Sequence, residues 1–206
     1  MQYLEIKENL KKFIVISRRD ILKVDPDFHD QRLSEWQKKG YIKKVVKGYY
    51  IFSDLEINEY VLFEIANKIY NPSYISSEMA LSYYHFIPES VYGITSVSTR
   101  RTYSFKTPIA EFIYKTIKPQ LFLGYELIKY NNNKYIKIAS LEKAILDYFY
   151  LHSDIKGEND FASLRLNKEI FLKEFNEEKL NKFLERFAQK SLTKRIESFG
   201  EFMKNA

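Results

Sequence analysis

Residues near the start of the chain combine the side-chain types that contact DNA. Gln31, Arg32 and Ser34 alternate with the apolar residues Leu33 and Trp36. In the major groove Arg pairs with guanine, Gln pairs with adenine, and Ser bonds to several base edges. Basic side chains that could contact phosphates flank this run, namely Arg18, Arg19, Lys38 and Lys47. The alternative is an ordinary helix with a solvated, charged face, because short motifs often match by chance.

Two short helices are expected to position these side chains. Ser17 and Asp20 have the spacing of a capping box, in which the hydroxyl and the carboxylate bond the free amides of a helix start. The first helix should therefore cover residues 18–23. Pro26 should interrupt it, because proline cannot continue a helix but fits the first turn of a new one.

The second helix should be capped by Asp25 or Asp27 and continue to Lys39. Gly40 then ends it, since glycine adopts the left-handed conformation that helix ends favour.

The segments around these helices complete a recognisable motif. Residues 41–46 and 49–53 are rich in β-forming side chains and are joined through Lys47-Gly48, which predicts a hairpin, or wing. An opening helix is expected within residues 1–13. This order of elements is typical of a winged helix-turn-helix, whose second helix enters the major groove.

The net charge of +6 is concentrated in the same segment. Residues 1–53 hold 12 Lys and Arg against 7 Asp and Glu, a net of +5, which leaves +1 for the rest of the chain. Neutralising phosphates supplies much of the affinity of DNA-binding modules, so this placement favours the DNA-binding interpretation.

Composition argues against several other classes. Cys is absent, so disulfides, thiolate metal sites and a Cys nucleophile are ruled out. The first residues are charged and no apolar run approaches twenty residues, so neither a signal peptide nor a membrane span is visible. We therefore expect a cytoplasmic protein without a cofactor or a metal.

A second, larger unit should follow a short polar hinge. Apolar residues at helical spacing predict helices at 60–69 and 141–151, the latter capped by Ser140, and Asn167 and Asn176 should cap later helices. Segments rich in β-formers predict strands at 91–98, 102–107, 111–117, 120–123, 126–130 and 134–138.

The expected fold is therefore α+β in two domains. Residues 1–54 form a winged helix-turn-helix domain. Residues 57–206 form an α+β domain with a small, mostly antiparallel sheet and a helical C-terminal tail.

Five segments of the second unit carry a resemblance to a known family. They are residues 74–88, 94–101, 107–108, 112–125 and 139–151. Together with the preceding winged helix they resemble the AbiEi-type antitoxin family, predicted transcriptional regulators of phage-defence systems. Members have Pro after the Ala-Ser pair of the last segment, where this chain has Leu141. That departure touches only the start of a helix.

The resemblance implies a type IV toxin-antitoxin role. An antitoxin of this kind represses its own operon, so the first partner would be operator DNA, with inverted half-sites if two copies bind. The second partner would be a cognate nucleotidyltransferase toxin, which the second domain counters with or without direct contact. Arg100 and Arg101, which follow a Thr-rich strand, could contact the toxin or an RNA phosphate. A solvated turn at the end of a strand explains this pair equally well.

Catalysis has little support in the sequence. The three histidines, His29, His85 and His152, are far apart, and no Gly-rich phosphate loop is present. Glu142 and Asp147 are five residues apart and so do not share a helix face. We expect no enzymatic activity. Two alternatives stay open: a nucleic-acid-processing enzyme positioned by its winged helix, and a transcriptional regulator that responds to a small effector.

Overall fold

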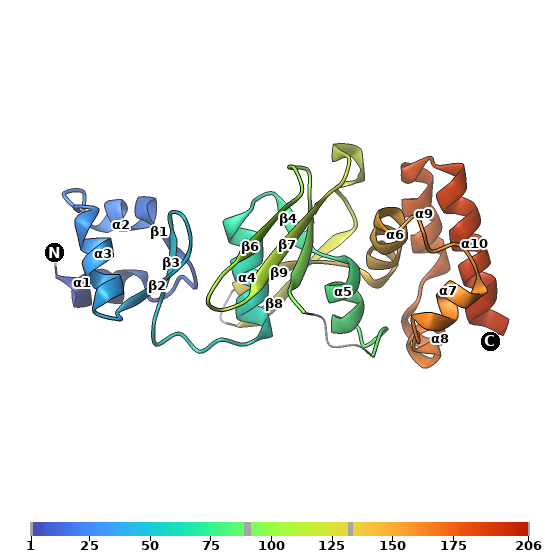
Figure 1. Cartoon of the computed structure of the whole chain (residues 1–206), viewed down its shortest axis with the longest axis horizontal. Helices are drawn as coiled ribbons and strands as arrows, with labels where there is room; N and C mark the ends of the chain where they lie inside the picture. The colour runs from blue at the N-terminus through green and yellow to red at the C-terminus, as the bar shows by residue number, and fades with distance from the viewer. Residues whose placement is uncertain (1, 89–91, 132–133, 206) are drawn as a thin grey trace.

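The computed structural model describes residues 2–88, 92–131 and 134–205 of the chain. Within these ranges the protein is α+β, with ten α-helices, a three-stranded antiparallel sheet and a six-stranded mixed sheet. Figure 1 shows a small first unit, a central sheet and a group of C-terminal helices in a row, with the two termini at opposite ends.

The first unit packs three helices against its small sheet. Its elements are α1 (Tyr3–Leu10), β1 (Ile16–Ser17), α2 (Arg18–Val24), α3 (Gln31–Lys38), β2 (Ile42–Val46) and β3 (Tyr49–Phe52). The strand order is β1-β3-β2, and all pairs are antiparallel. Ile6, Ile21, Leu33, Trp36 and Ile42 are among the buried residues of its core. The helix anchors proposed from the sequence therefore lie inside, and the hairpin is confirmed.

The capping box at the start of α2 is also confirmed. The Ser17 hydroxyl accepts a hydrogen bond from the Asp20 amide at 3.3 Å, and the Ser17 amide donates to the Asp20 carboxylate at 2.9 Å. Partial burial raises the pKa of Asp20. The hydrogen bonds from Ser17 outweigh burial and hold this pKa below its usual value.

Replacing Ser17 with Ala should therefore lower the free energy of unfolding by about 1 kcal/mol at neutral pH. The pKa of Asp20 is lower in the folded protein, so its contribution is present above the unfolded pKa of about 4 and is lost as the pH falls through the folded value. Urea titrations of both proteins at pH 7 and pH 3 measure this. A difference that does not shrink at pH 3 would contradict the role of the ionised carboxylate.

The start of α3 differs from the prediction. Asp25 is the C-cap of α2, and α3 begins at Gln31 with Asp30 as its N-cap. The Asp30 side chain makes no capping hydrogen bond but forms an ion pair with Arg18 at 2.5 Å. The predicted cap at Asp25 or Asp27 is therefore wrong. The Pro26 segment forms a turn between the helices and does not open the second one.

The central sheet has strand order β6-β7-β5-β4-β9-β8. Its strands are β4 (Ser73–Ile75), β5 (Ile94–Ser98), β6 (Tyr103–Lys106), β7 (Glu111–Thr116), β8 (Tyr125–Asn131) and β9 (Lys134–Ala139). The β6-β7, β4-β5 and β8-β9 pairs are antiparallel, whereas β5-β7 and β4-β9 are parallel. The sheet is thus mixed and larger than the small, mostly antiparallel sheet expected.

Most predicted elements of this unit are confirmed, one is wrong, and one strand was missed. The hairpin β8-β9 and the helices α4 (Glu59–Ile69) and α6 (Leu141–Leu151) lie where the sequence placed them, and the Ser140 hydroxyl caps α6. The strand predicted at residues 120–123 is wrong, because Pro119–Leu121 form a 3-10 helix. Strand β4 was not predicted. Residue 91, the start of one predicted strand, lies outside the described residues.

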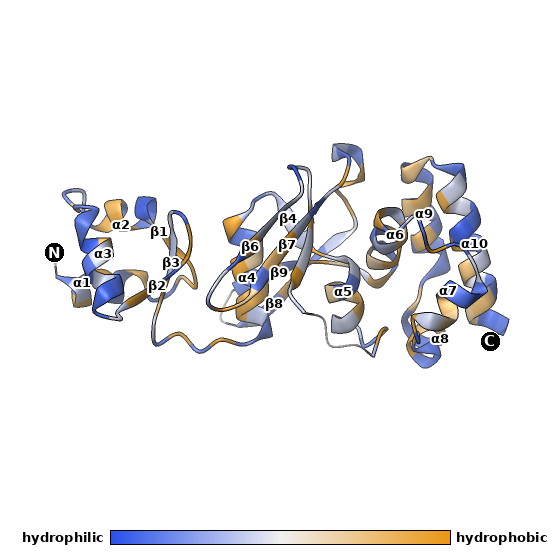
Figure 2. Ribbon diagram, viewed as in Figure 1, coloured by the Kyte–Doolittle hydropathy of each residue, from blue (hydrophilic) through white to orange (hydrophobic). Residues whose placement is uncertain are grey.

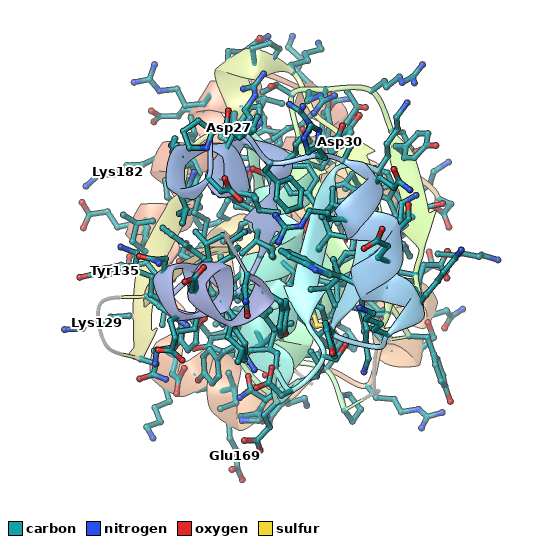
Figure 3. The ribbon with its side chains drawn as sticks, turned by 90° about the vertical axis from the view of Figure 1, so that its left-hand side faces the viewer. Asp27, Asp30, Lys129, Tyr135, Glu169 and Lys182 are labelled. Carbon is teal, nitrogen blue, oxygen red and sulfur yellow. The ribbon has the colours of Figure 1, made fainter. Side chains whose placement is uncertain are left out.

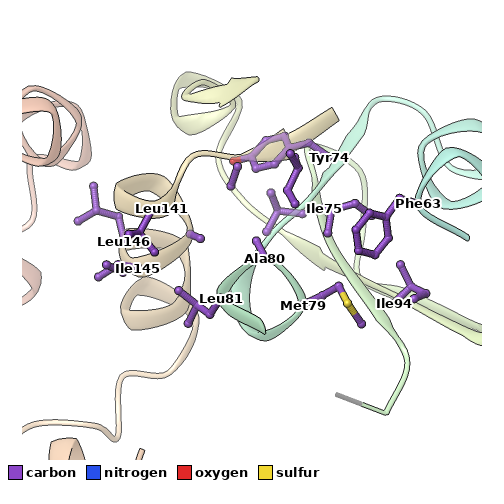
Figure 4. Packing of buried hydrophobic residues seen from close by; sticks show 14 of the residues in the cluster. Phe63, Tyr74, Ile75, Met79, Ala80, Leu81, Ile94, Leu141, Ile145 and Leu146 are labelled. Atoms are coloured by element: carbon purple, nitrogen blue, oxygen red, sulfur yellow. The ribbon is translucent and has the colours of Figure 1, made fainter. Parts of the chain in front are cut away.

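Helices cover the sheet on both sides. Helix α4 packs along β4, β5 and β9, and its Asn67 side chain bonds both backbone groups of Lys137. Helix α5 (Ser77–Tyr83) packs against α6 and β5. Figure 4 shows Leu81 of α5 in the space between these helices.

Four helices complete the chain, namely α7 (Glu158–Ser163), α8 (Lys168–Glu174), α9 (Glu177–Phe187) and α10 (Lys190–Asn205). The predicted caps Asn167 and Asn176 are confirmed at the starts of α8 and α9. Leu184, Phe187 and Phe199 lie in the apolar core that these helices share with α6. In Figure 2 their polar residues lie on the outward sides of α9 and α10.

The first unit also touches the second through apolar side chains. Ile14, Val15, Val45 and Ile51 belong to the apolar cluster of the second unit, while the core between α1, α2 and α3 is a separate cluster. Residues 53–58, which contain no helix or strand, connect the two units. None of the helices in the described ranges has the length and apolar character needed to cross a membrane.

Candidate nucleic-acid interface

Helix α3 exposes a polar stripe opposite its buried side. Gln31, Ser34 and Lys38 are exposed, and their spacing places them on one side of the helix. Leu33 and Trp36 are buried on the other side. An exposed helix with Gln and Ser near its N-terminus and Lys near its C-terminus can present hydrogen-bonding groups to base edges and a charge to phosphate.

Arg32 does not lie on this stripe. Its guanidinium lies 5.1 Å from the Phe28 ring centre and 5.3 Å from the Trp36 ring centre. One of its nitrogens is 3.3 Å from the Asp25 carboxylate. The side chain is therefore half-buried and ties α3 to the turn after α2. The sequence grouped Arg32 with Gln31 and Ser34, but the fold gives it a structural position.

The two arginines of α2 have different surroundings. Arg18 forms the ion pair with Asp30, while Arg19 is exposed. Figure 3 looks at the first unit end-on and shows Asp27 and Asp30 projecting from the turn between α2 and α3. This turn is therefore acidic, and phosphate contacts are more favourable away from it. Arg19 fits a phosphate contact better than Arg18, whose charge Asp30 partly neutralises.

The hairpin carries three exposed lysines, of which the sequence singled out only Lys47. Lys43 and Lys44 on β2 are exposed as well, while Ile42 and Val45 beside them are buried. Their signal was present in the sequence as a polar pair between apolar positions of a predicted strand. Lys47 lies at the turn, where Gly48 has a positive φ of 85°. Three cations on one hairpin form a concentrated contact for phosphates.

Arg100 and Arg101 lie together on a rigid loop of the second unit. The Tyr70 hydroxyl donates to the Arg101 carbonyl at 2.8 Å, and the Thr116 hydroxyl donates to the Arg100 carbonyl at 2.7 Å. The Arg100 guanidinium lies 4.0 Å from the Tyr70 ring centre. Among the described residues no carboxylate forms an ion pair with either arginine. Both charges are therefore exposed on an ordered backbone and available to an anionic partner.

The sequence missed a buried ionic cluster between α6 and β4. Lys143 and Asp147 are fully buried and form an ion pair one turn apart. The other carboxylate oxygen accepts hydrogen bonds from the Tyr74 hydroxyl at 2.9 Å and the Ser76 hydroxyl at 2.7 Å. The spacing of four residues between Lys143 and Asp147, which places them on one side of a helix, is the sequence signal for this pair.

Burial dominates the electrostatics of this cluster. Desolvation lowers the pKa of Lys143 although the neighbouring Asp147 carboxylate favours its charged form. Desolvation, reinforced by the same carboxylate, raises the pKa of Tyr74 well above its usual value. Both groups are fully buried, so the cluster joins α6 to the sheet and does not reach the surface. In the described ranges no group of three His, Asp or Glu side chains is placed to hold a metal ion.

The candidate residues lie on two separate parts of the molecule. Gln31, Ser34, Lys38, Arg19 and Lys47 are exposed on α2, α3 and the hairpin, whereas Arg32 is packed against aromatic rings. Arg100 and Arg101 belong to a different surface at the end of β5. In comparisons with known proteins, no protein-family model and no curated protein sequence matches the chain.

Proposed function

We propose that the first unit is a winged helix-turn-helix that binds duplex DNA. The observation that carries this proposal is the set of exposed Lys and Arg side chains on α2, α3 and the hairpin of one small unit. The order of three helices followed by a hairpin supports it, as does the net charge of +5 on residues 1–53. Gln31 and Ser34 would contact base edges, and Arg19, Lys38 and the hairpin lysines would contact phosphates.

Gln31 and Arg32 should respond differently to substitution by Ala. Gln31→Ala should lower affinity for the operator by about 1–3 kcal/mol, leave random DNA unaffected and leave folding unchanged. Arg32→Ala should also lower the midpoint of thermal unfolding, because it removes the ion pair that Arg32 forms with Asp25 and the cation beside the Phe28 and Trp36 rings. Fluorescence anisotropy on the DNA upstream of the gene and on a scrambled duplex, with thermal melts, measures both effects.

The scrambled duplex of equal length is the control for sequence reading. Equal losses on both duplexes for Gln31→Ala would contradict the assignment of α3 as the recognition helix. An Arg32→Ala variant that folds as stably as the wild type would show that its contacts with Phe28, Trp36 and Asp25 contribute little.

We further propose that the chain is the antitoxin and autorepressor of a type IV toxin-antitoxin pair. This rests on the resemblance of residues 74–88 and 139–151 to AbiEi-type antitoxins and on the exposed arginine pair of the second unit. The toxin would be a nucleotidyltransferase encoded in the neighbouring reading frame. If that frame encodes an unrelated protein, the alternative functions are favoured, namely a nucleic-acid-processing enzyme or an effector-responsive regulator.

The two roles should be separable in the full chain. Arg100→Glu with Arg101→Glu should abolish protection of cells against the toxin and leave repression intact, since those side chains lie away from α3. The control Lys118→Glu with Lys129→Glu makes the same charge change at other exposed positions and should protect normally. Growth after toxin induction and a reporter fused to the promoter measure the two roles. If the arginine variant still protects cells, Arg100 and Arg101 do not belong to the surface that counters the toxin.

The domain boundary at residues 54–57 remains a prediction. The apolar contact of Ile14, Val15, Val45 and Ile51 with the second unit would be exposed if the chain were cut there. Substitutions in the full chain therefore separate the two roles more cleanly than fragments, because they leave this contact in place.

A further inference from the structure

A cavity of about 310 Å³ lies between α5, α6 and the loop that joins α7 to α8. Its lining is mostly apolar and includes Leu81, Phe86, Ile145, Phe149, Leu164 and Leu166. Ligand sites in proteins have volumes of roughly 300–1,000 Å³ and combine an apolar lining with a few polar groups. This cavity is therefore large enough for a small organic molecule.

Hydrogen bonds hold the walls of the cavity in place. The Asn167 amide donates to the Phe86 carbonyl at 2.9 Å, which fixes the α7-α8 loop to the turn after α5. The Arg195 guanidinium of α10 donates to the carbonyls of Phe149 at 2.8 Å and His152 at 3.0 Å, which fixes the end of α6. A ligand would enter a preformed site and would not have to order these segments.

Glu78 is the one charged residue in the lining. Its carboxylate lies 3.2 Å from Nε2 of His152, and among the described residues this is its one ion-pair partner. Nδ1 of the same ring is 2.9 Å from the Tyr148 carbonyl oxygen. A carbonyl can only accept, so Nδ1 carries a hydrogen. Nε2 is therefore the ring nitrogen that faces Oε1 of Glu78, and among the described residues the other oxygen of this carboxylate makes no hydrogen bond or ion pair.

We infer that this cavity binds a small organic cation, with an aromatic body against the apolar lining and an ammonium group on the Glu78 carboxylate. An ammonium can donate a hydrogen bond to the second Glu78 carboxylate oxygen, and its charge complements the carboxylate. An anionic ligand of the same shape would meet Glu78 and be repelled. This site lies in the second unit and does not depend on DNA binding.

Two probes with the same ring and opposite charge test the inference on the full chain. Tryptamine should bind, and indole-3-acetate should bind at least about tenfold more weakly, as measured by isothermal titration calorimetry. Glu78→Gln should remove this preference by weakening tryptamine binding. The matched control is Glu169→Gln on α8, whose side chain projects into solvent in Figure 3 and does not line the cavity; it should keep the preference.

The outcomes are decisive in either direction. Equal binding of both probes, binding of neither, or a charge preference that survives Glu78→Gln would overturn the inference. If Glu78→Gln fails to fold, as judged by circular dichroism, the preference of the wild-type chain still decides. Ser163 lines the cavity, and Ser163→Phe should block it. Loss of tryptamine binding in this variant would show that the probe enters this cavity and does not bind another surface.

Discussion

Replacing Asp147 with Asn should lower the free energy of unfolding by about 3–5 kcal/mol, the usual effect of breaking a buried ion pair from one side. The Lys143 ammonium would remain fully buried without its counter-charge. Lys143→Met should lower the free energy of unfolding by a smaller amount, because Asp147 keeps its hydrogen bonds from Tyr74 and Ser76. Urea unfolding followed by circular dichroism measures these differences.

Helix α9 offers a matched control for this prediction. Lys182 and Glu178 form an ion pair with the same spacing of four residues, but their side chains are 70% and 78% exposed. Lys182→Met should change stability by less than about 0.5 kcal/mol, because solvent screens an exposed pair. Replacing Lys143 with Met and Asp147 with Asn together should recover much of the loss, since no charge is then buried and the amide oxygen can still accept hydrogen bonds from Tyr74 and Ser76. If Asp147→Asn lowers the free energy of unfolding as little as the α9 control Lys182→Met does, the buried cluster contributes little to stability.

Replacing Lys43, Lys44 and Lys47 together with Gln should sharply weaken binding to DNA of any sequence. Each phosphate contact that is lost flattens the plot of log affinity against log salt concentration by about 0.9, so three contacts should flatten it by roughly three units. The loss should be similar for operator and scrambled DNA, because phosphates carry no sequence information. Anisotropy titrations at several salt concentrations give the slope directly.

The control for the hairpin variant removes the same charge from the opposite end of the molecule. Lys173, Lys190 and Lys194 are exposed on α8 and α10, and replacing them with Gln gives the same net charge. If this control weakens binding as much as the hairpin variant does, net charge and not the hairpin governs affinity. The proposal that the hairpin is a DNA-contacting wing would then fail.

Local signals explain which parts of the fold could be predicted. The capping box of Ser17 and Asp20 and the caps Ser140, Asn167 and Asn176 each bond an amide three residues away, so a short window of sequence contains them. The hairpin β8-β9 is equally local. The start of α3 was misplaced because Asp25, Asp27 and Asp30 are all acceptable caps, and only the Arg18–Asp30 pair and the packing of Phe28 distinguish them.

The α+β class, most helices and the concentration of positive charge in the first unit can be predicted from the sequence, because residue types and short spacings carry that information. Which polar groups lie inside depends on the three-dimensional packing of the chain. The parallel β4-β9 pair joins strands about sixty residues apart and brings Tyr74 to Asp147. Packing against Phe28 and Trp36 takes Arg32 off the exposed stripe, and the α7-α8 loop encloses a cavity beside Glu78. Burial depends on remote segments that cover a residue, and no local pattern records those contacts.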